Sequence, residues 1–321
     1  MTTNSSELHV IFGTGAMGAS VMEALIKRGK RIRMINRGGK PSIATGSPAG
    51  VEFVKADVMN AESTRSAAQG ATHIYQCAQP EYHEWAEKFP PLQTNILNAA
   101  AAHNARLIVV ENLYMYGDPN GQPIVEAMPY KPTSKKGEVR AAMTRELEEA
   151  HASGKVRVVR GRGSDFYGAG YMIMGDQVFY PALAGKQASG IGSLDLPHTF
   201  TYTKDFGAAL VMLGEHDDAY GQAWHVPSTT LTQRELIEMA FKAAGTAPKI
   251  GVINKVMMRV GGLFMPGARE MIEMMYEFEK PFIMDSSKIE RAFGMTATPP
   301  EQAITETVAW FKANPKPNKK H

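Results

Sequence analysis

Cysteine and net charge are both scarce in this sequence. Cys77 is the single cysteine among 321 residues, which excludes an intramolecular disulfide framework and a zinc site built from cysteines. Lys and Arg number 35 against 32 Asp and Glu, and the formal net charge of +3 gives no electrostatic argument for nucleic-acid binding. The histidines lack metal-ligand spacing. We therefore expect neither a metal site nor a nucleic-acid partner.

Long apolar runs are also missing. No segment reaches the roughly 18 uninterrupted apolar residues of a membrane span. Residues 1–7 do not combine a basic segment with an apolar one, so we expect no secretion signal there. These two absences predict a cytoplasmic protein without a membrane partner.

The first half of the chain alternates between strand and helix patterns. Residues 8–12 form a short apolar run, residues 19–28 carry apolar side chains at helical spacing, and residues 31–35 alternate as in a strand. The alternation continues to about residue 160 with short connections. It predicts an α/β fold with a doubly wound parallel sheet covered by helices on both faces.

The pattern changes after Gly161. Residues 161–203 are rich in glycine and tyrosine, which predicts loops with short elements. Helical patterns follow, and the one that runs to about Ala244 begins with the capping-box sequence Thr232-Gln-Arg-Glu235. The predicted division is a first domain at 1–165, to which 204–227 returns, and a smaller, mostly helical C-terminal lobe at 166–203 and 228–321.

A glycine-rich turn joins the first strand to the first helix, in the order Gly13-Thr-Gly15-Ala-Met-Gly18. Gly13 permits a tight turn, Gly15 lets a pyrophosphate approach the backbone, and Gly18 lets the helix pack closely on the strand. Free amides at the helix N-terminus then face the phosphates. The turn therefore predicts a dinucleotide cofactor bound by the first domain.

The end of the second strand reads Ile35-Asn36-Arg37. NAD enzymes usually place an Asp or Glu here, which binds the ribose hydroxyls. Asn36 has no charge to repel a phosphate, and Arg37 can bind one bidentately. We predict NADP as the cofactor, with NAD as second choice.

Two further strand ends contribute candidate cofactor contacts. Asp57 follows the third strand, where a short polar side chain could meet the adenine, although it also fits a helix cap. Cys77-Ala78-Gln79 ends the fourth strand, near the expected cofactor ribose, and Cys77 fits a small buried residue better than a reactive thiol.

Taken together, these residues resemble the extended short-chain dehydrogenase/reductase superfamily, of the NAD-dependent epimerase/dehydratase type. The resemblance covers nearly the whole chain. The motifs that carry it are Gly13-x-Gly15-x-x-Gly18, Lys55-Ala-Asp57, Asn95, Leu113-Tyr-Met-Tyr116-Gly117, Arg160-Gly-Arg-Gly-Ser-Asp165-Phe-Tyr167-Gly168 and Phe200-Thr-Tyr202-Thr-Lys-Asp205. The resemblance implies a Rossmann-type fold with a C-terminal substrate lobe and hydride transfer to or from a small-molecule carbonyl. It also implies a tendency to form homodimers.

The chain departs from the family at the catalytic residues. The family's proton donor is the tyrosine of Tyr-x-x-x-Lys, a few residues after a proline. Alignment on Pro132 and Gly137 places Lys136 at the tyrosine and Arg140 at the lysine, and the family serine falls near Asn112. The usual triad is therefore missing, and Lys136, Arg140, Asn112 and Tyr116 are the catalytic candidates.

Three interpretations of Lys136 and Arg140 stay open. Lys136 could donate the proton if the neighbouring cation and burial lowered its pKa, while Arg140 held the nicotinamide ribose. The two cations could instead bind an acidic substrate. They could also be two charges on a solvated helix face.

The substrate side offers several aromatic candidates. Tyr116 and Tyr167 match family positions that line the cleft, and Tyr114, Tyr130 and Tyr171 are other possible acids. His198, expected in a loop before the Tyr202 strand, could act as an acid near neutral pH. We name Tyr167 and His198 as substrate contacts.

The sequence thus predicts an NADP-dependent oxidoreductase in which Lys136-x-x-x-Arg140 replaces the usual pair. The alternatives are a non-catalytic NADP-binding sensor and a sugar-nucleotide epimerase or dehydratase. The predicted cofactor-binding residues are Gly13, Thr14, Gly15, Ala16, Met17, Gly18, Asn36, Arg37, Asp57, Val58, Cys77, Ala78, Gln79, Asn95 and Lys136.

Overall fold

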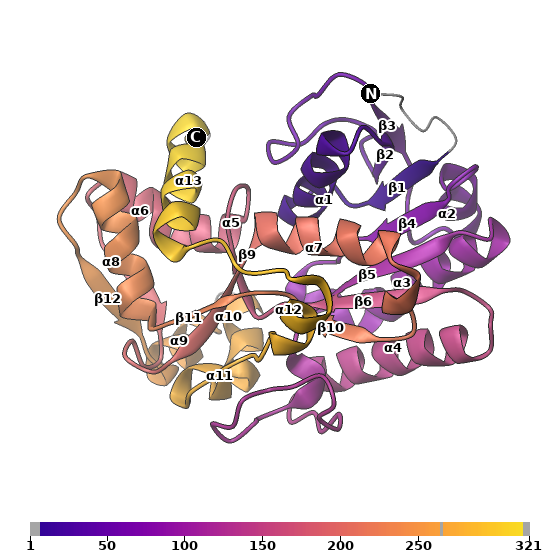
Figure 1. Ribbon diagram of the computed structural model, residues 1–321. Coiled ribbons are helices and arrows are strands. Elements are labelled where there is room, and N and C mark those ends of the chain that lie inside the picture. Colours follow the sequence, from indigo (N-terminus) through magenta and orange to yellow (C-terminus); the bar gives the residue numbers. More distant parts are fainter. Residues whose placement is uncertain (1–6, 264–265, 317–321) are drawn as a thin grey trace.

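A seven-stranded parallel sheet forms the centre of the molecule (Figure 1). The computed structural model describes residues 7–263 and 266–316. In spatial order the strands are β10 (Ala223–His225), β6 (Val158–Arg162), β5 (Arg106–Glu111), β4 (His73–Gln76), β1 (Leu8–Phe12), β2 (Arg31–Asn36) and β3 (Val51–Lys55). Every neighbouring pair is parallel. The predicted doubly wound α/β fold is confirmed.

Helices cover both faces of this sheet because the central strands are apolar on both sides. Ile11 of β1 packs with α1 (Ala16–Lys27) and α7 (Thr203–Glu215). Val10 and Phe12 point to the other face, which is covered by α2 (Ala61–Ala67), α3 (Trp85–Ala102) and α4 (Lys135–Ala152). Strands buried on both faces are typical of parallel sheets.

The strand order reverses at β1. From β1 the chain runs outward through β2 and β3, and then returns to β4 on the other side of β1. In such sheets the crevice at the carboxyl ends of the strands, beside the reversal, is the usual place for a ligand. The ends of β1, β2, β4, β5 and β6 therefore frame the candidate site.

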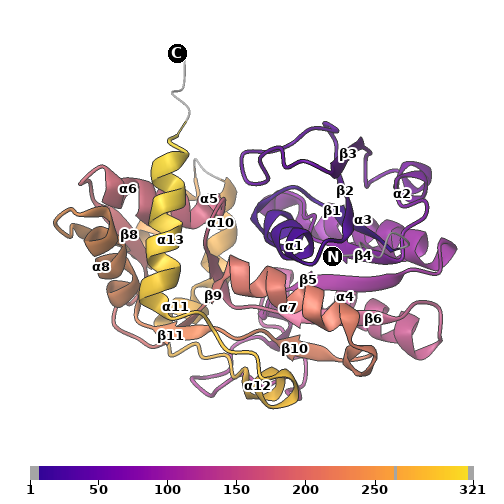
Figure 2. The ribbon, with the colours of Figure 1, turned by 45° about the horizontal axis from the view of Figure 1, so that its top comes forward.

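The remaining elements form a smaller lobe. Figure 2 shows α6, α8 and α13 grouped at one end of the molecule. Its strands form a three-stranded and a two-stranded sheet: β11 (Thr229–Leu231), β9 (His198–Tyr202) and β7 (Asp165–Tyr167), and β12 (Ile250–Ile253) with β8 (Ala188–Ile191). The helices after β7, apart from α7, are α5 (Met172–Met174), α6 (Tyr180–Leu183), α8 (Gln233–Ala244), α9 (Lys255–Gly261), α10 (Pro266–Met271), α11 (Tyr276–Glu279), α12 (Ser287–Phe293) and α13 (Pro300–Ala313).

The start of α8 agrees with the capping-box sequence at Thr232–Glu235. At the start of α8 the Thr232 amide donates to the Glu235 carboxylate (2.7 Å), and the Glu235 amide donates to the Thr232 hydroxyl (3.1 Å). This confirms the predicted capping box.

The start of α3 follows tertiary packing instead. The helix begins at Trp85 and contains Pro90 and Pro91. Trp85 and Phe89 are buried with their rings edge to face at 5.1 Å, and this contact stabilises the first turns of the helix.

A buried ion pair joins the ends of β5 and β6. Arg162 Nε donates to Glu111 Oε2 (2.8 Å), and both side chains are fully buried. Thr144 donates to the other carboxylate oxygen (2.6 Å), and Arg162 also donates to Tyr130 (2.8 Å). Burial raises the pKa of Glu111, but the surrounding guanidinium groups, led by Arg162, outweigh burial and hold that pKa at about 2.

This pair predicts a specific loss of stability in acid. Between about pH 2 and the ordinary pKa of 4.5, Glu111 stays ionised in the folded protein while the unfolded chain takes up the proton. Its contribution, on the order of 3 kcal/mol, is complete above about pH 5 and is lost as the pH falls toward 2. Urea denaturation at several pH values should show this slope in the wild type and lose it in Glu111→Gln.

Glu149→Gln is the matched control, because Glu149 is exposed on the same helix as Thr144. Glu111→Gln should also cost about 3–5 kcal/mol at neutral pH, since it leaves Arg162 buried without its counter-ion. An acid slope equal to that of the wild type would contradict this account.

Candidate cofactor and substrate site

The glycine turn after β1 has no room for side chains at two of its three glycines. Gly13 has φ +110°, and a Cβ there would lie 2.8 Å from the Ala78 nitrogen. A Cβ at Gly18 would lie 2.1 Å from the Gly13 carbonyl oxygen. At Gly15, by contrast, a Cβ would meet no described atom within 4 Å. The first and third glycines are thus required by the fold, whereas Gly15 borders open space.

The N-terminus of α1 is open toward this space. No described side chain caps the helix at Gly15. The adjoining loop instead fixes the turn from behind: the Ser42 hydroxyl donates to the Thr14 carbonyl (2.5 Å), and Asn36 Nδ2 donates to the Thr14 hydroxyl (2.9 Å). Ala16 and Met17 supply the first helical amides. The turn and these amides fit the pyrophosphate of a dinucleotide.

Asn36 and Arg37 have different surroundings. Asn36 donates also to the Lys40 carbonyl (2.7 Å) and accepts from the Gly38 amide (3.0 Å), so its side chain shapes the loop after β2. Arg37 is exposed and forms no side-chain hydrogen bond or ion pair with residues 7–263 or 266–316. Glu84, a carboxylate within electrostatic range of Arg37, is paired with Lys88 instead.

The loop after β3 lies beside α3. Asn95 Nδ2 donates to the Val58 carbonyl (2.8 Å), which ties this loop to α3. Asp57 is exposed and accepts from the Met59 amide (3.0 Å). The helix-cap role belongs to Asn60, which accepts from the Ser63 amide (2.8 Å). Asp57 is thus left at the surface near the end of β3.

The end of β4 lies against the glycine turn. The Cys77 amide donates to the Phe12 carbonyl (2.9 Å), and Ala78 is the residue that a side chain at Gly13 would strike. Gln79 follows directly. The Cys77 thiol packs at the edge of the core between the sheet, α1 and α7, and burial raises its pKa. A thiol in such a setting is unreactive.

Lys136 and Arg140 are buried, so the interpretation as a solvated helix face is wrong. Lys136 Nζ lies 4.4 Å from the centre of the Tyr82 ring and pairs with Glu270 and Glu273. Arg140 donates to the Val110 carbonyl (3.2 Å) and stacks over Phe89. Arg140 Nε is buried and has no hydrogen-bond partner within the described chain.

A pair of tyrosines lies beside Lys136. The Tyr82 hydroxyl donates to the Tyr114 hydroxyl (3.4 Å), and burial raises the pKa of both phenols. Asn112 Oδ1 accepts from the Tyr114 amide (3.3 Å). Sequence reasoning missed Tyr82, because it stands in a short 3-10 turn after β4 that carries no motif.

Tyr116 belongs to the buried ion-pair network. Its hydroxyl accepts from Arg162 and lies 3.1 Å from His225 Nε2. The partners of this hydroxyl are therefore core residues, and we do not carry Tyr116 forward as a catalytic residue.

The predicted substrate contacts Tyr167 and His198 lie on neighbouring strands, β7 and β9. His198 was expected in a loop, but it is the first residue of β9 and is buried. It pairs with Asp165 (2.9 Å) and stacks on Phe278 of α11 at 5.2 Å. Tyr167 stacks on Tyr202 at 5.4 Å. The cited contacts of both side chains therefore lie within the smaller lobe.

Three glutamates of the α10–α11 segment complete the site. Glu270 and Glu273 pair with Lys136, and Glu277 is buried with Oε1 unpartnered among the described residues. Burial, and secondarily the nearby Asp165, raises the pKa of Glu277 well above its usual value. In the sequence these glutamates look like the polar face of a helix, so no local pattern could reveal that they face inward.

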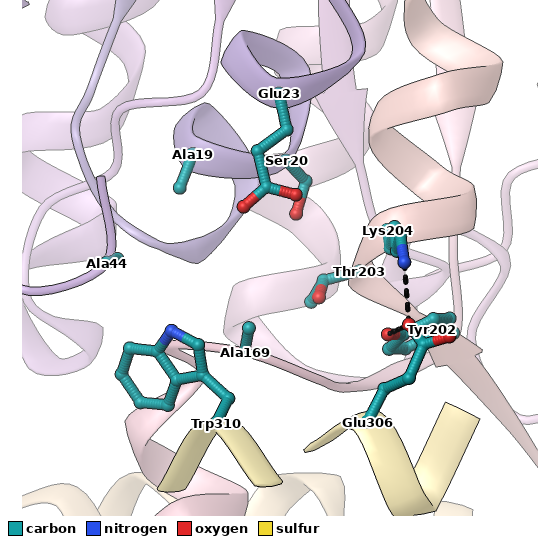
Figure 3. Close-up of a pocket in the computed structure, with 10 residues that line it drawn as sticks. All are labelled: Ala19, Ser20, Glu23, Ala44, Ala169, Tyr202, Thr203, Lys204, Glu306 and Trp310. Carbon is teal, nitrogen blue, oxygen red and sulfur yellow. Dashed lines mark hydrogen bonds and ion pairs between the residues drawn. The ribbon is translucent and has the colours of Figure 1, made fainter. Parts of the chain in front are cut away.

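A separate pocket of about 170 Å³ lies between the lobes, lined by none of the predicted site residues (Figure 3). Ser20 and Glu23 of α1 face it from one side and Trp310 of α13 from the other, with Lys204 paired to Glu306 at its edge.

The sheet and the glycine turn define the class of the protein, a Rossmann-type α/β protein with a turn that fits a dinucleotide. The chain belongs to the NAD-dependent epimerase/dehydratase family, whose model matches residues 10–226. This family consists of enzymes that use an NAD(P)-type cofactor, so the prediction of an NAD(P)-dependent enzyme is confirmed at that level. No curated protein sequence is similar enough to count as a relative.

Solved structures share the fold over nearly the whole chain. UDP-glucose 4-epimerase from Thermus thermophilus, in complex with NAD, is 19% identical with a TM-score of 0.75, covering 95% of this chain and 99% of that one. dTDP-glucose 4,6-dehydratase from Streptomyces venezuelae, with NAD bound, is 16% identical with a TM-score of 0.76, covering 96% and 97%. UDP-N-acetylglucosamine 4-epimerase from Bacillus cereus is 17% identical with a TM-score of 0.74, covering 96% and 97%.

The described residues contain neither a membrane-spanning helix nor a cluster of metal ligands. Within 7–263 and 266–316, no helix has both the length and the apolar character needed to cross a bilayer. The same residues contain no cluster of His, Cys, Asp and Glu fit to hold a metal ion.

The surroundings of Cys77 predict slow thiol chemistry. Because burial raises the pKa of Cys77, little thiolate forms near neutral pH. The native protein should react with a disulfide reagent at least about 100-fold more slowly than the protein in guanidinium chloride. Colour release at a single thiol measures both rates, and equal rates would refute the assignment.

Proposed function

We propose that the protein is an NADP-dependent oxidoreductase of the extended short-chain type, which transfers hydride to or from a small-molecule carbonyl or alcohol. The observation that carries the NADP preference is Arg37, an exposed guanidinium without a side-chain partner among the described residues, next to the uncapped glycine turn. A guanidinium in this place suits the 2′-phosphate of NADP.

Different predicted residues bind different parts of the cofactor. The amides of the glycine turn and of the first turn of α1 hold the pyrophosphate, and Arg37 holds the 2′-phosphate. Asp57 and Val58 lie toward the adenine. Arg140 Nε, buried and unpartnered within the described residues, donates to a ribose hydroxyl.

The reacting carbonyl lies between the carboxyl edge of the sheet and the smaller lobe. When bound, the cofactor supplies or accepts the hydride. The Oδ1 atom of Asn112 accepts a hydrogen bond from the Tyr114 amide. Its Nδ2 group donates to the carbonyl oxygen of the substrate and orients it. The proton for that oxygen comes from the group formed by Lys136, Tyr82 and Tyr114.

Two alternatives have support of their own. The nucleotide-sugar enzymes among the similar structures favour an epimerase or dehydratase, which would purify with tightly held cofactor. Lys136 at the position of the family tyrosine favours a sensor that binds NADP without turnover. The absorbance spectrum of denatured protein tests the first alternative, and a substrate screen that follows cofactor oxidation tests the second.

The cofactor assignment predicts the effect of removing Arg37. Arg37→Ala should weaken NADPH binding by about 10- to 100-fold, because a hydrogen bond to a charged group contributes roughly 1.5–3 kcal/mol. NADH binding should change by less than about twofold, since NADH lacks the phosphate. Calorimetric titration of both cofactors measures this.

Lys40→Ala, which removes another exposed cation from the same loop, is the control. NAD that binds the wild type as tightly as NADP would disprove the preference.

Alanine substitutions at Gly15 and Gly18 should affect different properties, namely cofactor affinity at Gly15 and the stability of the fold at Gly18. Ala fits at position 15 without a clash, so Gly15→Ala should change the free energy of unfolding by less than about 1 kcal/mol. Its methyl group occupies the approach of the pyrophosphate, so NADPH affinity should fall by about tenfold or more. Gly18→Ala should cost about 1–3 kcal/mol, because its Cβ meets the Gly13 carbonyl. Denaturation and titration together test this, and a Gly15→Ala variant that binds normally would contradict the site.

A further inference from the structure

The start of α4 binds two carboxylates of the same chain. Glu273 accepts from the backbone amides of Lys135 (2.8 Å) and Lys136 (3.3 Å), and its Oε1 lies 3.3 Å from Lys136 Nζ. Glu270 binds the same ammonium group. The first turn of an 18-residue helix and a buried lysine thus converge on one acidic side chain.

Helix amides and an ammonium group that converge in this way are groups that favour an oxyanion. Helix amides and the helix dipole favour negative charge at the N-terminus, and the Lys136 ammonium adds a full positive charge. The Lys136 side chain is 4% exposed, so it needs a permanent counter-ion. Glu270 and Glu273 remain 29% and 25% exposed, so either carboxylate can return to water at little cost.

The position of the contact connects it to the proposed reaction. Lys136 lies over Tyr82, whose hydroxyl contacts Tyr114 beside Asn112 at the end of β5. Tyr82 is within electrostatic range of both Glu273 and Glu277. Glu277 is 2% exposed, and its Oε1 has no partner in the described chain. Among the described residues, this buried acceptor near Tyr82 therefore lacks the hydrogen bond that buried polar atoms usually make, and a donor group of a ligand can supply it.

We propose that the substrate carries a carboxylate or phosphate group, which binds Lys136 and the first amides of α4 in place of Glu270 and Glu273. In the free protein the two glutamates act as an internal substitute for that group. When the substrate binds, the segment from Pro266 to Glu279 moves away from α4, and Lys136 exchanges one counter-ion for another. This inference rests on the proposed function, for which it names the substrate class.

The test is a titration of the full-length protein with succinate and, in a second arm, with inorganic phosphate. Sodium chloride at matched ionic strength is the reference, because screening alone weakens ion pairs. Affinity is measured by calorimetry, and release of residues 266–279 by hydrogen–deuterium exchange. In the wild type, exchange in this segment should rise with succinate or phosphate and stay unchanged with chloride.

One group of variants removes the carboxylates of Glu270 and Glu273, and another removes the Lys136 ammonium group that binds them. Glu273→Gln and Glu270→Gln/Glu273→Gln should bind one of the two anions about tenfold more tightly than the wild type, because the competitor is gone. The combined variant Lys136→Met/Glu273→Gln should not show this gain in anion affinity, because the lysine that binds the anion is missing. The arm with the larger gain shows whether the site takes a carboxylate or a phosphate.

Glu279→Gln is the matched control. Glu279 belongs to the same segment but pairs with Lys255 (3.1 Å). It should bind both anions like the wild type. If the double variant does not fold, the single variant and the exchange data on the wild type still decide the question.

Two outcomes would overturn the inference. One is an affinity of Glu273→Gln within twofold of the wild type for both anions, and the other is an equal gain in Glu279→Gln. Failure of the proposed function gives a different result: NADP does not bind, while anion binding that depends on Lys136 persists.

Discussion

The close approach of three backbone segments at the glycine turn is the constraint on which this molecule depends. Gly13 allows the end of β4 to come next to β1, and Gly18 allows α1 to start directly over the turn. A side chain at Gly13 would push the turn away from the end of β4, and one at Gly18 would push α1 away from the turn. The same contacts leave the N-terminus of α1 open at the carboxyl edge, so the packing that builds the fold also creates the candidate phosphate site.

Charge is distributed unevenly around that edge. On the cofactor side, exposed Arg37 lies beside an uncapped helix end, which suits a highly anionic ligand. On the substrate side, Lys136 is enclosed by carboxylates, and Glu277 is buried nearby. At the ends of β5 and β6, the buried side chains of Glu111 and Arg162 neutralise each other. Burial raises the pKa of Glu277, which favours its neutral form, whereas Glu111, Lys136 and Arg162 each have a counter-ion.

Local patterns in the sequence predicted most of the fold, and they also supplied the residues that we propose to bind the cofactor. The glycine turn, the strand ends at Asn36 and Cys77, and the capping box at Thr232 depend on residues close together in the chain. They can therefore be recognised without knowing the tertiary structure.

The substrate half depends on contacts between distant residues. Lys136 meets Glu270 and Glu273 across more than 130 positions of sequence, and His198 meets Asp165 across two strands that are not consecutive. Tyr82 and Glu277 carry no motif, and it is the packing of α10 against the short 3-10 turn at Tyr82–Glu84 that brings their two segments together. Tyr116 matched a family position, but its hydroxyl is taken up by Arg162.

The pocket between α1 and α13 gives the molecule an intrinsic optical reporter. Of the three tryptophans, Trp85 and Trp224 are buried in the core around the central sheet, whereas Trp310 is half-buried and faces α1 across the pocket. A change in the spacing of the two lobes alters the polarity around that indole and leaves the other two as they are. Its fluorescence can therefore follow closure of the lobes without any label.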